Sequence, residues 1–460
     1  MSCWCAPEPC RAPPATRSAA APAARPISPR RWCPSAWTRL RPPAQATFRP
    51  PPQLWTSPMI DLASFNSLAP GLRDNPHPVY SALREQAPIF WTDTEQAWVL
   101  LRHREVSEAF TNSSLLTLDL GQFVGDVSRA LGDNPVELLR LLKMALFFRN
   151  PPSHGPLRSL VARLLALRSQ ASCAAAVQRI AHRLIAPLAR DGGIDLMRDY
   201  ADPLPPLFMG WLYGLSDDEA LWLAATLAGV PVILNRGCSI RDYRSANLRL
   251  EEAHVFLRDR LAERRRTPAD DGLSLLLSRN DEADQPMDEY HLAALASFVF
   301  MAGFETTAAL IGNGLWLLLR HPEHCDSMAA DPALISGAVN EALRLEAPIQ
   351  QVRRRAMTDQ TIADCQVKAG QHLILMIAAA NRDPRAYPDP DRYLPGRTGP
   401  SVQSFGGGLH HCLGGWIARM EAEMATREVL EGPRPHVVLE KPPWRPLHNQ
   451  RRMNSLPVQI

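Results

Sequence analysis

Several features that would assign this chain to a broad class are missing from its sequence. The most apolar stretch, residues 290–319, is interrupted by Glu305 and Asn313, so no uninterrupted run of about 20 apolar residues is available to cross a membrane. The formal net charge is only +3 over 460 residues, which gives no general attraction to nucleic acid. We therefore expect a cytoplasmic protein with no membrane span and no nucleic-acid partner.

The cysteines also lack the pattern of a structural framework. They are nine in number, odd and widely dispersed, which argues against paired disulfides and fits a reducing compartment. No second Cys or His pair at zinc-site spacing accompanies His410, His411 and Cys412, so a zinc site there is a weak alternative. The role of Cys412 must therefore be judged from its local surroundings.

Residues 1–58 differ from the rest of the chain. They lack lysine and hold 14 prolines, eight arginines and a single acid, Glu8, without hydrophobic periodicity. A transit peptide, a functional basic tail and upstream sequence read from a misassigned start all fit this composition. The third is favoured, because Met59 opens ordinary globular sequence. We predict a disordered Pro/Arg-rich extension over 1–58 and one large domain over 59–460.

The sequence after residue 58 predicts a mainly α fold with small β-sheets. A hairpin is expected over 89–101, with a helix starting soon after His103, and Ser216 with Glu219 forms a capping box that opens a helix. A second hairpin is expected between 361–363 and 372–377, followed by a turn-rich loop over 381–400. Further helices are expected over residues 248–265, 288–320, 334–345 and 413–430.

A glycine-dense loop, residues 405–415, leads directly into the last of these helices. Its sequence is Phe-Gly-Gly-Gly-Leu-His-His-Cys-Leu-Gly-Gly. The sulfur of Cys412 would lie at a helix N-terminus, where unpaired N–H groups and the helix dipole favour a thiolate. Glycines on both sides let the backbone and a flat ligand approach closely. The pattern indicates a metal-ligating cysteine, with an ordinary buried thiol as the alternative.

This loop resembles the haem-ligand signature of the cytochromes P450, Phe-Gly-x-Gly-x-His-x-Cys-x-Gly, with every fixed position present. Three other stretches in the family's order support the resemblance, which runs from about residue 60 to the C-terminus. They are the oxygen-binding motif at 302–307, the Glu-x-x-Arg pair at 341–344 and the meander at 388–393. The resemblance implies the cytochrome P450 fold, with haem between the long central helix and the helix after the Cys loop.

The resemblance also implies the residues that hold the haem. Cys412 would be the axial ligand, and Phe405 would cover the thiolate side. The haem propionates would bind His410, an arginine of the run 353–355, and the His and Arg four residues apart in the 150–158 stretch, which are His154 and Arg158. The family's Arg-x-Ala pattern favours Arg354, although three consecutive arginines leave the register open by one residue. A solvated basic run is the alternative reading.

Glu305 and Thr306 are the predicted catalytic residues. A carboxylate and a hydroxyl within an apolar helix are costly unless they face a cavity, and Gly303 would let the helix open locally. The resemblance implies that they deliver protons to dioxygen. In the alternative, Thr306 bonds back to its own helix and Glu305 pairs with a distant arginine. Phe304 and the pair Gln350-Gln351 are expected to flank the same pocket.

Two other features concern the framework around this site. The resemblance implies a buried structural triad in which Glu341 and Arg344 share a helix face and Arg392 supplies a second guanidinium. The ligand loop departs from many bacterial relatives, which have an aromatic residue at the position of His411 and Ala-Pro in place of Gly415-Trp416. These differences leave the ligand pattern intact and leave the details of electron transfer open.

The implied function is that of a soluble, bacterial-type haem-thiolate monooxygenase. It would hold haem b (iron protoporphyrin IX) and insert one oxygen atom from dioxygen into a mostly apolar small organic substrate, by hydroxylation or epoxidation. Electrons would come from NAD(P)H through a separate ferredoxin and ferredoxin reductase, because no stretch resembles a flavin or iron–sulfur module. We expect a monomer that performs a tailoring step in secondary metabolism.

Two alternatives to this function stay open at the level of the sequence. One is peroxide-driven oxidation by the same haem, against which the presence of Glu305 and Thr306 argues. The other is a non-catalytic haem protein that binds or senses a ligand. The substrate depends on the stretches 112–145 and 205–245, in which no pattern identifies it.

Overall fold

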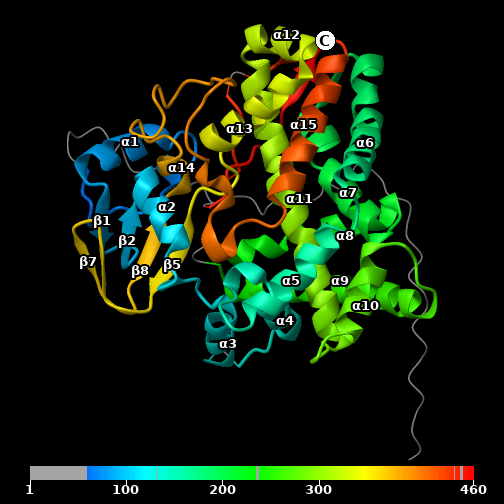
Figure 1. Cartoon of the computed structure of the whole chain (residues 1–460), viewed down its shortest axis with the longest axis horizontal. Helices are drawn as coiled ribbons and strands as arrows, with labels where there is room; N and C mark the ends of the chain where they lie inside the picture. Colours follow the sequence, from blue (N-terminus) through cyan, green and yellow to red (C-terminus); the bar gives the residue numbers. More distant parts are fainter. Residues whose placement is uncertain (1–59, 131, 235–237, 440, 446–448) are drawn as a thin grey trace, which may run out of the picture.

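The computed structural model describes residues 60–460 apart from 131, 235–237, 440 and 446–448. The predicted extension over 1–58, and Met59 itself, therefore lie outside the described residues. The described chain is mainly helical, with its larger sheet beside α1 on one side of the helices (Figure 1). This arrangement confirms the predicted fold class.

The helices follow one another along most of the chain. Those of the first half are α1 (His77–Gln86), α2 (His103–Thr111), α3 (Leu120–Ala130), α4 (Val136–Met144), α5 (His154–Leu165), α6 (Gln170–Asp191), α7 (Leu204–Tyr213) and α8 (Asp217–Leu227). Those of the second half are α9 (Ile240–Arg266), α10 (Gly272–Asp281), α11 (Glu289–Leu319), α12 (Pro322–Ala330), α13 (Ile335–Leu345), α14 (Ile377–Ala380) and α15 (Gly415–Glu431).

Short helical turns lie between these helices. One of them, η4 (Leu196–Ala201), is a π-helical turn. The others are 3-10 turns: η2 (Pro70–Leu72), η3 (Leu146–Phe148), η5 (Val230–Leu234), η6 (Pro332–Leu334), η7 (Gln403–Phe405) and η8 (Gly408–His410).

Helix α11 is the centre of the molecule. It is apolar on every side, its N-terminus is capped by Asp288, and it packs against α4, α7, α9, α13 and α15 (Figure 1). Its length and composition would also suit a membrane span, as would the bent pair α5 and α6 taken together, but most of α11 is buried among other helices. A helix that is hydrophobic all round is expected in the core of a large domain, as the sequence predicted.

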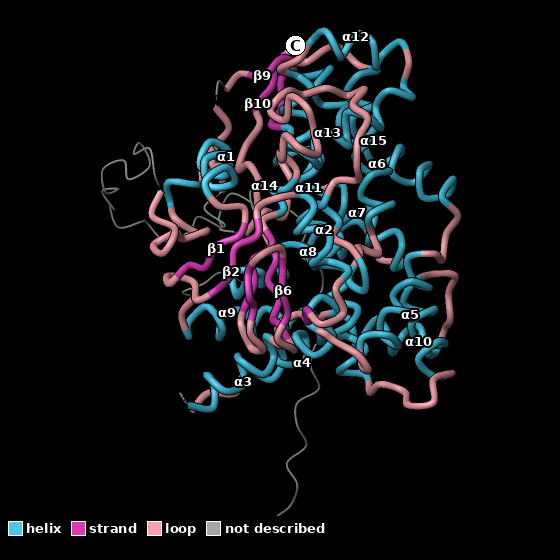
Figure 2. Tube along the Cα trace, turned by 60° about the vertical axis from the view of Figure 1, so that its left-hand side comes forward, coloured by secondary structure: helices cyan, strands magenta, loops and turns pink. Residues whose placement is uncertain are grey.

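The strands form three small sheets. The five-stranded sheet has the order β1-β2-β8-β5-β3, in which β2 and β8 are parallel and the other neighbours are antiparallel. Figure 2 shows β9 and β10 near the C-terminus, away from β1 and β2. The strands are β1 (Ile89–Thr92), β2 (Ala97–Leu100), β3 (Leu115–Leu116), β4 (Gly193–Asp195), β5 (Val352–Ala356), β6 (Gln360–Ile362), β7 (Cys365–Val367), β8 (His372–Leu375), β9 (His436–Val437) and β10 (Pro457–Gln459).

Most predicted elements are confirmed, but the second hairpin is wrong. β6 pairs with β7, because Ala363 adopts a positive φ of 48° and turns the chain back immediately. The apolar strand β8 instead lies between β2 and β5 in the larger sheet. The run of arginines at 353–355, for which no strand was predicted, forms part of β5. The partners of β8 lie far away in the sequence or were not predicted as strands, so a local pattern could not identify them.

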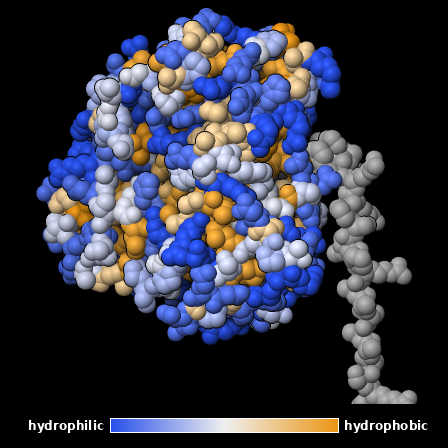
Figure 3. All heavy atoms as spheres, turned by 45° about the vertical axis from the view of Figure 1, so that its right-hand side comes forward, coloured by the Kyte–Doolittle hydropathy of each residue, from blue (hydrophilic) through white to orange (hydrophobic). Residues whose placement is uncertain are grey.

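The outer surface does not present a continuous apolar face in the view of Figure 3. Hydrophilic residues cover most of that face, and hydrophobic residues occur there in separate small groups. Surface apolar residues scattered in this way are normal for a folded domain.

Candidate functional site

The loop before α15 is closed on itself by its own backbone. The N–H of Cys412 donates to the carbonyl of Phe405 at 3.0 Å. Gly406 and Gly408 have φ values of 64° and 59°, which favour glycine, and a Cβ at Gly408 would lie 2.5 Å from the carbonyl oxygen of Phe110. The glycines therefore let the loop lie directly against α2 while it presents Cys412 at the start of α15.

Cys412 is the exposed cysteine among the five in the described residues. Protein surrounds its sulfur closely enough that burial raises the pKa of the thiol, while the N–H groups of Gly414 and Gly415 and the charge of Arg158 lower it. Burial outweighs these lowering influences, so the protein alone does not stabilise the thiolate that the sequence led us to expect. A bound cation would reverse this balance, because metal coordination deprotonates a thiol.

The zinc alternative finds no support in the structure. Among the described residues, no group of three or more His, Cys, Asp or Glu side chains could hold a metal ion. A metal at Cys412 would therefore need its other ligands from a non-protein group, as a porphyrin provides.

Phe405 is fixed beside the start of α15. Its ring lies so close to Gly415 that a Cβ there would be 3.3 Å from a ring carbon, and the guanidinium of Arg419 lies 4.9 Å from the ring centroid. The aromatic side chain thus covers the first turn of α15, the side of the loop on which it was predicted to shield the thiolate.

Basic side chains gather near the ligand loop. The rings of His154 and His410 have centroids 4.6 Å apart, and Arg158 donates to the carbonyl of His411 at 2.8 Å. Burial, Arg354, His154 and Arg158 lower the pKa of His410 to about 4. The predicted propionate partners therefore lie together although they come from α5, β5 and the ligand loop.

The three consecutive arginines of strand β5 have different surroundings. Arg353 forms an ion pair with Glu95, and Arg355 is exposed. Arg354 is 6% exposed, and its side-chain hydrogen bond goes to the carbonyl of Arg353 at 2.9 Å. Burial lowers the pKa of Arg354 to about 10, and no salt bridge reaches it from the rest of the described chain. This placement favours the register in which Arg354 is the propionate partner.

The cluster fits an anionic group. Both ring nitrogens of His154 are buried without a hydrogen-bond partner within the described structure. The guanidinium of Arg354 is buried without a carboxylate, and such groups are costly unless paired. Two carboxylates on a flat ligand held above Cys412 would satisfy both requirements, so these residues fit haem.

Helix α11 exposes a short stretch near its middle. Ala302 is exposed and Gly303 and Thr306 are partly exposed, whereas residues 292–301 before them are all buried. Farther along the helix, Gly314 and Trp316 are also partly exposed. The hydroxyl of Thr306 donates to the carbonyl of Ala302 at 3.3 Å, which is the back-bonded arrangement of the alternative interpretation. Thr306 nevertheless lies on the accessible side of the helix, one turn after Ala302.

The side chains next to Thr306 point elsewhere. Glu305 is 6% exposed and accepts a hydrogen bond from Nε2 of Gln450 at 3.3 Å. Phe304 is buried against Phe300, with ring centroids 6.0 Å apart, because two residues along a helix turn a side chain by about 200°. The prediction that Phe304 flanks the same cavity as Thr306 is therefore wrong.

The two glutamines after α13 have buried side-chain oxygens without hydrogen-bond partners in the described structure. Gln350 and Gln351 are both buried, and no hydrogen bond reaches either side-chain oxygen from the described residues. Their predicted contact with a pocket stays a prediction.

The structural triad has a different third member. Arg344 binds Glu341 through two hydrogen bonds of 2.6 and 2.9 Å, as predicted. Arg397 completes the triad at 3.2 Å from Glu341, whereas the side chain of Arg392 is 70% exposed and only its carbonyl accepts from Arg344. The prediction of Arg392 is wrong because the path of the meander turns its side chain outward.

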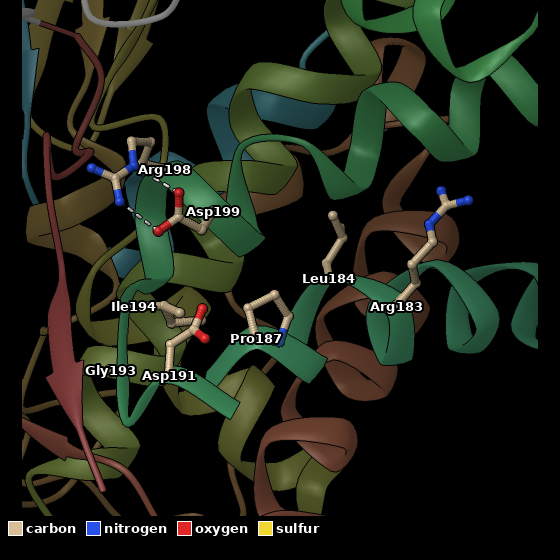
Figure 4. Close-up of a pocket in the computed structure, with 8 residues that line it drawn as sticks. All are labelled: Arg183, Leu184, Pro187, Asp191, Gly193, Ile194, Arg198 and Asp199. Carbon is tan, nitrogen blue, oxygen red and sulfur yellow. Dashed lines mark hydrogen bonds and ion pairs between the residues drawn. The ribbon is translucent and has the colours of Figure 1, made fainter. Parts of the chain in front are cut away.

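A separate cavity of about 370 Å³ lies between α6, β4 and η4 (Figure 4). Figure 4 shows Arg198 paired with Asp199 at its edge. It contains none of the predicted site residues. The cavity is lined by Arg183, Leu184, Pro187, Asp191, Gly193, Ile194, Arg198 and Asp199.

Comparisons with known proteins agree with this geometry. The family model for Cytochrome P450 matches residues 231–331 and 325–457. Vitamin D(3) 25-hydroxylase of Pseudonocardia autotrophica is 35% identical over 360 residues, which cover 76% of this chain and 84% of that protein. The cytochrome P450 monooxygenase PikC of Streptomyces venezuelae is 30% identical over 423 residues, covering 87% and 94%.

A solved structure supports the same assignment. The crystal structure of CalO2 has a TM-score of 0.79 and 25% sequence identity, covering 86% of this chain and 99% of that chain. The ligand loop, the accessible stretch of α11 and these relatives together lead to one conclusion. This chain belongs to the cytochrome P450 family of haem-thiolate monooxygenases.

Proposed function

We propose that this enzyme inserts one oxygen atom from dioxygen into a mostly apolar small organic substrate, by hydroxylation or epoxidation. The observation that carries the proposal is the placement of Cys412, an exposed residue just before α15, next to a basic cluster for which the described residues provide no buried carboxylate. The Pseudonocardia relative is named vitamin D(3) 25-hydroxylase, and a hydroxylation is a reaction of this class. We place the reaction in the cytoplasm, as a tailoring step of secondary metabolism carried out by a monomer.

The residues of this chain would hold the cofactor and control its surroundings. Cys412 would ligate the iron, while His154, Arg158, His410 and Arg354 would bind the two propionates. Haem b with a thiolate ligand supplies the activation of dioxygen and the electron density that favours O–O cleavage. The ring of Phe405 would exclude water from the thiolate side.

Proton supply is the task that we assign to α11. Thr306 lies on the accessible side of the helix and carries a hydroxyl that can donate or accept. Glu305 is the adjacent carboxylate, buried and in contact with Gln450. We propose that Glu305 takes up protons and that Thr306 hands them to the cavity, with a rotation of the Thr306 side chain away from Ala302.

The electrons would come from NAD(P)H through a separate ferredoxin and ferredoxin reductase. Members of the family use redox partners, and the described residues are taken up by the haem fold. NAD(P)H alone should therefore give no turnover, and addition of both partner proteins should start it.

The test is the spectrum of the reduced protein with carbon monoxide. We expect the strongly red-shifted Soret band of thiolate ligation, its loss in Cys412→Ala, and its retention in Cys365→Ala, a partly buried cysteine of β7. A Cys412→Ala protein that keeps the band would refute the ligand assignment. A normal band without turnover, even with both redox partners, would favour a ligand-binding haem protein, and turnover with peroxide alone would favour the peroxide-driven oxidase.

A further inference from the structure

Phe110, the last buried residue of α2, contacts two parts of the predicted haem site that come from distant segments. Its side chain is 7% exposed. The ring and backbone of Phe110 pack against the glycines of the ligand loop, and the guanidinium carbon of Arg354 lies 5.6 Å from the ring centroid. No motif of the sequence includes Phe110, so its place in the site arises only in the folded chain.

The ligand loop packs closely enough on Phe110 to fix its position. A Cβ at Gly406 would lie 3.4 Å from a carbon of the Phe110 ring, and a Cβ at Gly407 would lie 3.1 Å from the Cβ of Phe110. Both the ring and the main chain of this residue are therefore in contact with the loop. The same loop ends in Cys412, so the Phe110 side chain has a fixed place relative to the ligand cysteine.

Strand β5 is tied to the same end of α2. The chain that follows α2 forms β3, which pairs antiparallel with β5 so that Leu115 lies opposite Ala356. Arg354 and Ala356 are two residues apart on the strand and therefore share one face. Ala356 belongs to the same core cluster as Phe110. The face of β5 that carries Arg354 is thus held against α2 by both pairing and packing.

An aromatic ring can hold a guanidinium without using its N–H donors. The face of the ring attracts a cation within about 6 Å of the centroid. A carboxylate at this place would instead accept the N–H groups and neutralise the charge. No carboxylate of the described chain pairs with Arg354, whose side-chain hydrogen bond goes to the carbonyl of Arg353. The other N–H groups of this guanidinium are therefore left for an anionic ligand.

We propose that Phe110 is a positioning residue for cofactor binding: its ring holds the guanidinium of Arg354 in place for a haem propionate, in a fixed position relative to the ligand loop. The inference rests on the proposed function, because it takes Arg354 to bind a propionate. With the cation held in advance, less side-chain freedom is lost when haem binds. Without the attraction of the ring, this guanidinium would turn toward water and would have to be ordered again by the ligand.

Fluorination of the Phe110 ring tests this role with little change of shape, so that folding is preserved. Trifluorophenylalanine is introduced at this one position as an unnatural amino acid. Fluorine withdraws electron density from the ring, which removes most of its attraction for a cation while the apolar packing is retained. The control is the same replacement at Phe65, whose ring lies 5.6 Å from that of Phe90 in a separate core cluster.

Haem retention and the state of the propionates are the two readouts. Transfer of haem to an excess of apomyoglobin should be roughly threefold to tenfold faster from the protein fluorinated at Phe110, because a desolvated cation–π contact is lost. The rate should stay at the wild-type value in the Phe65 control. The propionate bending band in the resonance Raman spectrum should shift with Phe110, because this band reports hydrogen bonding to the carboxylates. The carbon monoxide band of thiolate ligation should keep its position.

The same fluorination in an Arg354→Leu protein separates the action of the ring on the cation from its packing against the loop. We expect no further acceleration of haem transfer in this background, because no guanidinium is left for the ring to hold. Equal acceleration in both backgrounds would overturn the inference. Arg354→Gln takes the place of Arg354→Leu if the latter binds no haem.

The outcomes also separate this inference from the proposed function. An unchanged transfer rate after fluorination of Phe110, in a protein with a normal thiolate band, would overturn the inference and leave the function intact. The inference fails as well if Arg354→Leu itself releases haem at the wild-type rate, because Arg354 then binds no propionate. A wild-type protein without the thiolate band would overturn the proposed function, and the inference with it.

Discussion

Three consecutive arginines show how strand geometry assigns different tasks to identical side chains. Side chains alternate between the two faces of a strand, so Arg354 points opposite to Arg353 and Arg355. Arg354 is the buried one without a carboxylate partner, whereas Arg353 is paired with Glu95. At the residue scale, therefore, the direction of a side chain separates a binding group from a structural one.

Arg354→Leu should lower the haem content of the purified protein, because one propionate loses its buried cationic partner. We expect at least about a tenfold weaker retention of haem, since loss of a charge-assisted hydrogen bond costs about 1.5–3 kcal/mol. The measurement is transfer of haem to an excess of apomyoglobin. Arg355→Leu, which changes an exposed side chain of the same strand, should transfer haem at the wild-type rate; equal rates in the two variants would contradict the assignment.

Thr306→Ala should leave haem content, carbon monoxide binding and substrate affinity nearly unchanged, because a small hydroxyl is lost from a cavity that water can refill. Coupling should fall: more of the reductant should emerge as hydrogen peroxide and less as oxygenated product. Glu305→Gln should instead slow reductant consumption, because the proton source itself is removed. NADH oxidised, peroxide formed and product formed are measured in one reaction. Unchanged coupling in Thr306→Ala would mean that its hydrogen bond to Ala302 is its main role.

At the scale of elements, α13 and the meander are joined by a buried ionic network. Glu341 on α13 accepts hydrogen bonds from Arg344 of the same helix and from Arg397 of the meander. Arg344 also donates to the carbonyls of Asn381, Pro390 and Arg392. The network thus holds the meander, which has little regular structure, against α13.

Arg397→Ala should destabilise the protein by about 1.5–3 kcal/mol, because a hydrogen-bonded charge is removed from a buried carboxylate. Arg392→Ala should change the free energy of unfolding by less than about 0.5 kcal/mol, because its side chain is exposed and its backbone carbonyl is retained. Urea denaturation of the two haem-loaded variants, followed by circular dichroism, makes the comparison. The opposite ranking would restore Arg392 as the third member of the triad.

At the scale of the whole molecule, the described core is built around α11. The ligand loop is held through α15, which packs on α11 and α6, and the basic cluster is brought from α5 and β5. The C-terminal segment reaches the same helix through Asn313 and Glu305. All contacts named for the site lie within the described residues, which begin at residue 60.

A chain that begins at Met59 should bind haem and melt like the full-length protein, since the resemblance to the family starts after that residue. Thermal melting of the two haem-loaded proteins provides the comparison. A melting temperature lower by more than about 5 °C in the shorter chain would show that residues 1–58 pack on the body, because such a shift implies well over about 1 kcal/mol.

The sequence determined the parts of this protein that depend on short spacings. The ligand loop with Cys412, the capping box of α8, the long buried α11 and the pairing of Glu341 with Arg344 all follow from residues a few positions apart. Local hydrogen-bonding geometry and helix periodicity make these features predictable from the sequence. Helix periodicity also places Phe304 on the side of α11 opposite to Ala302, because two residues along a helix turn a side chain by about 200°.

The tertiary structure alone decided the features that depend on distant contacts. The third member of the buried triad is Arg397 and not the predicted Arg392. The meander has no periodicity from which the direction of its side chains could be predicted. The burial of Arg354, which the Arg-x-Ala pattern already favoured, required the pairing of β5 with β8. The contact of Gln450 with Glu305 required the C-terminal segment to be anchored on α11. In each case the deciding energy comes from burial against a segment far away in the chain, which a local sequence pattern does not encode.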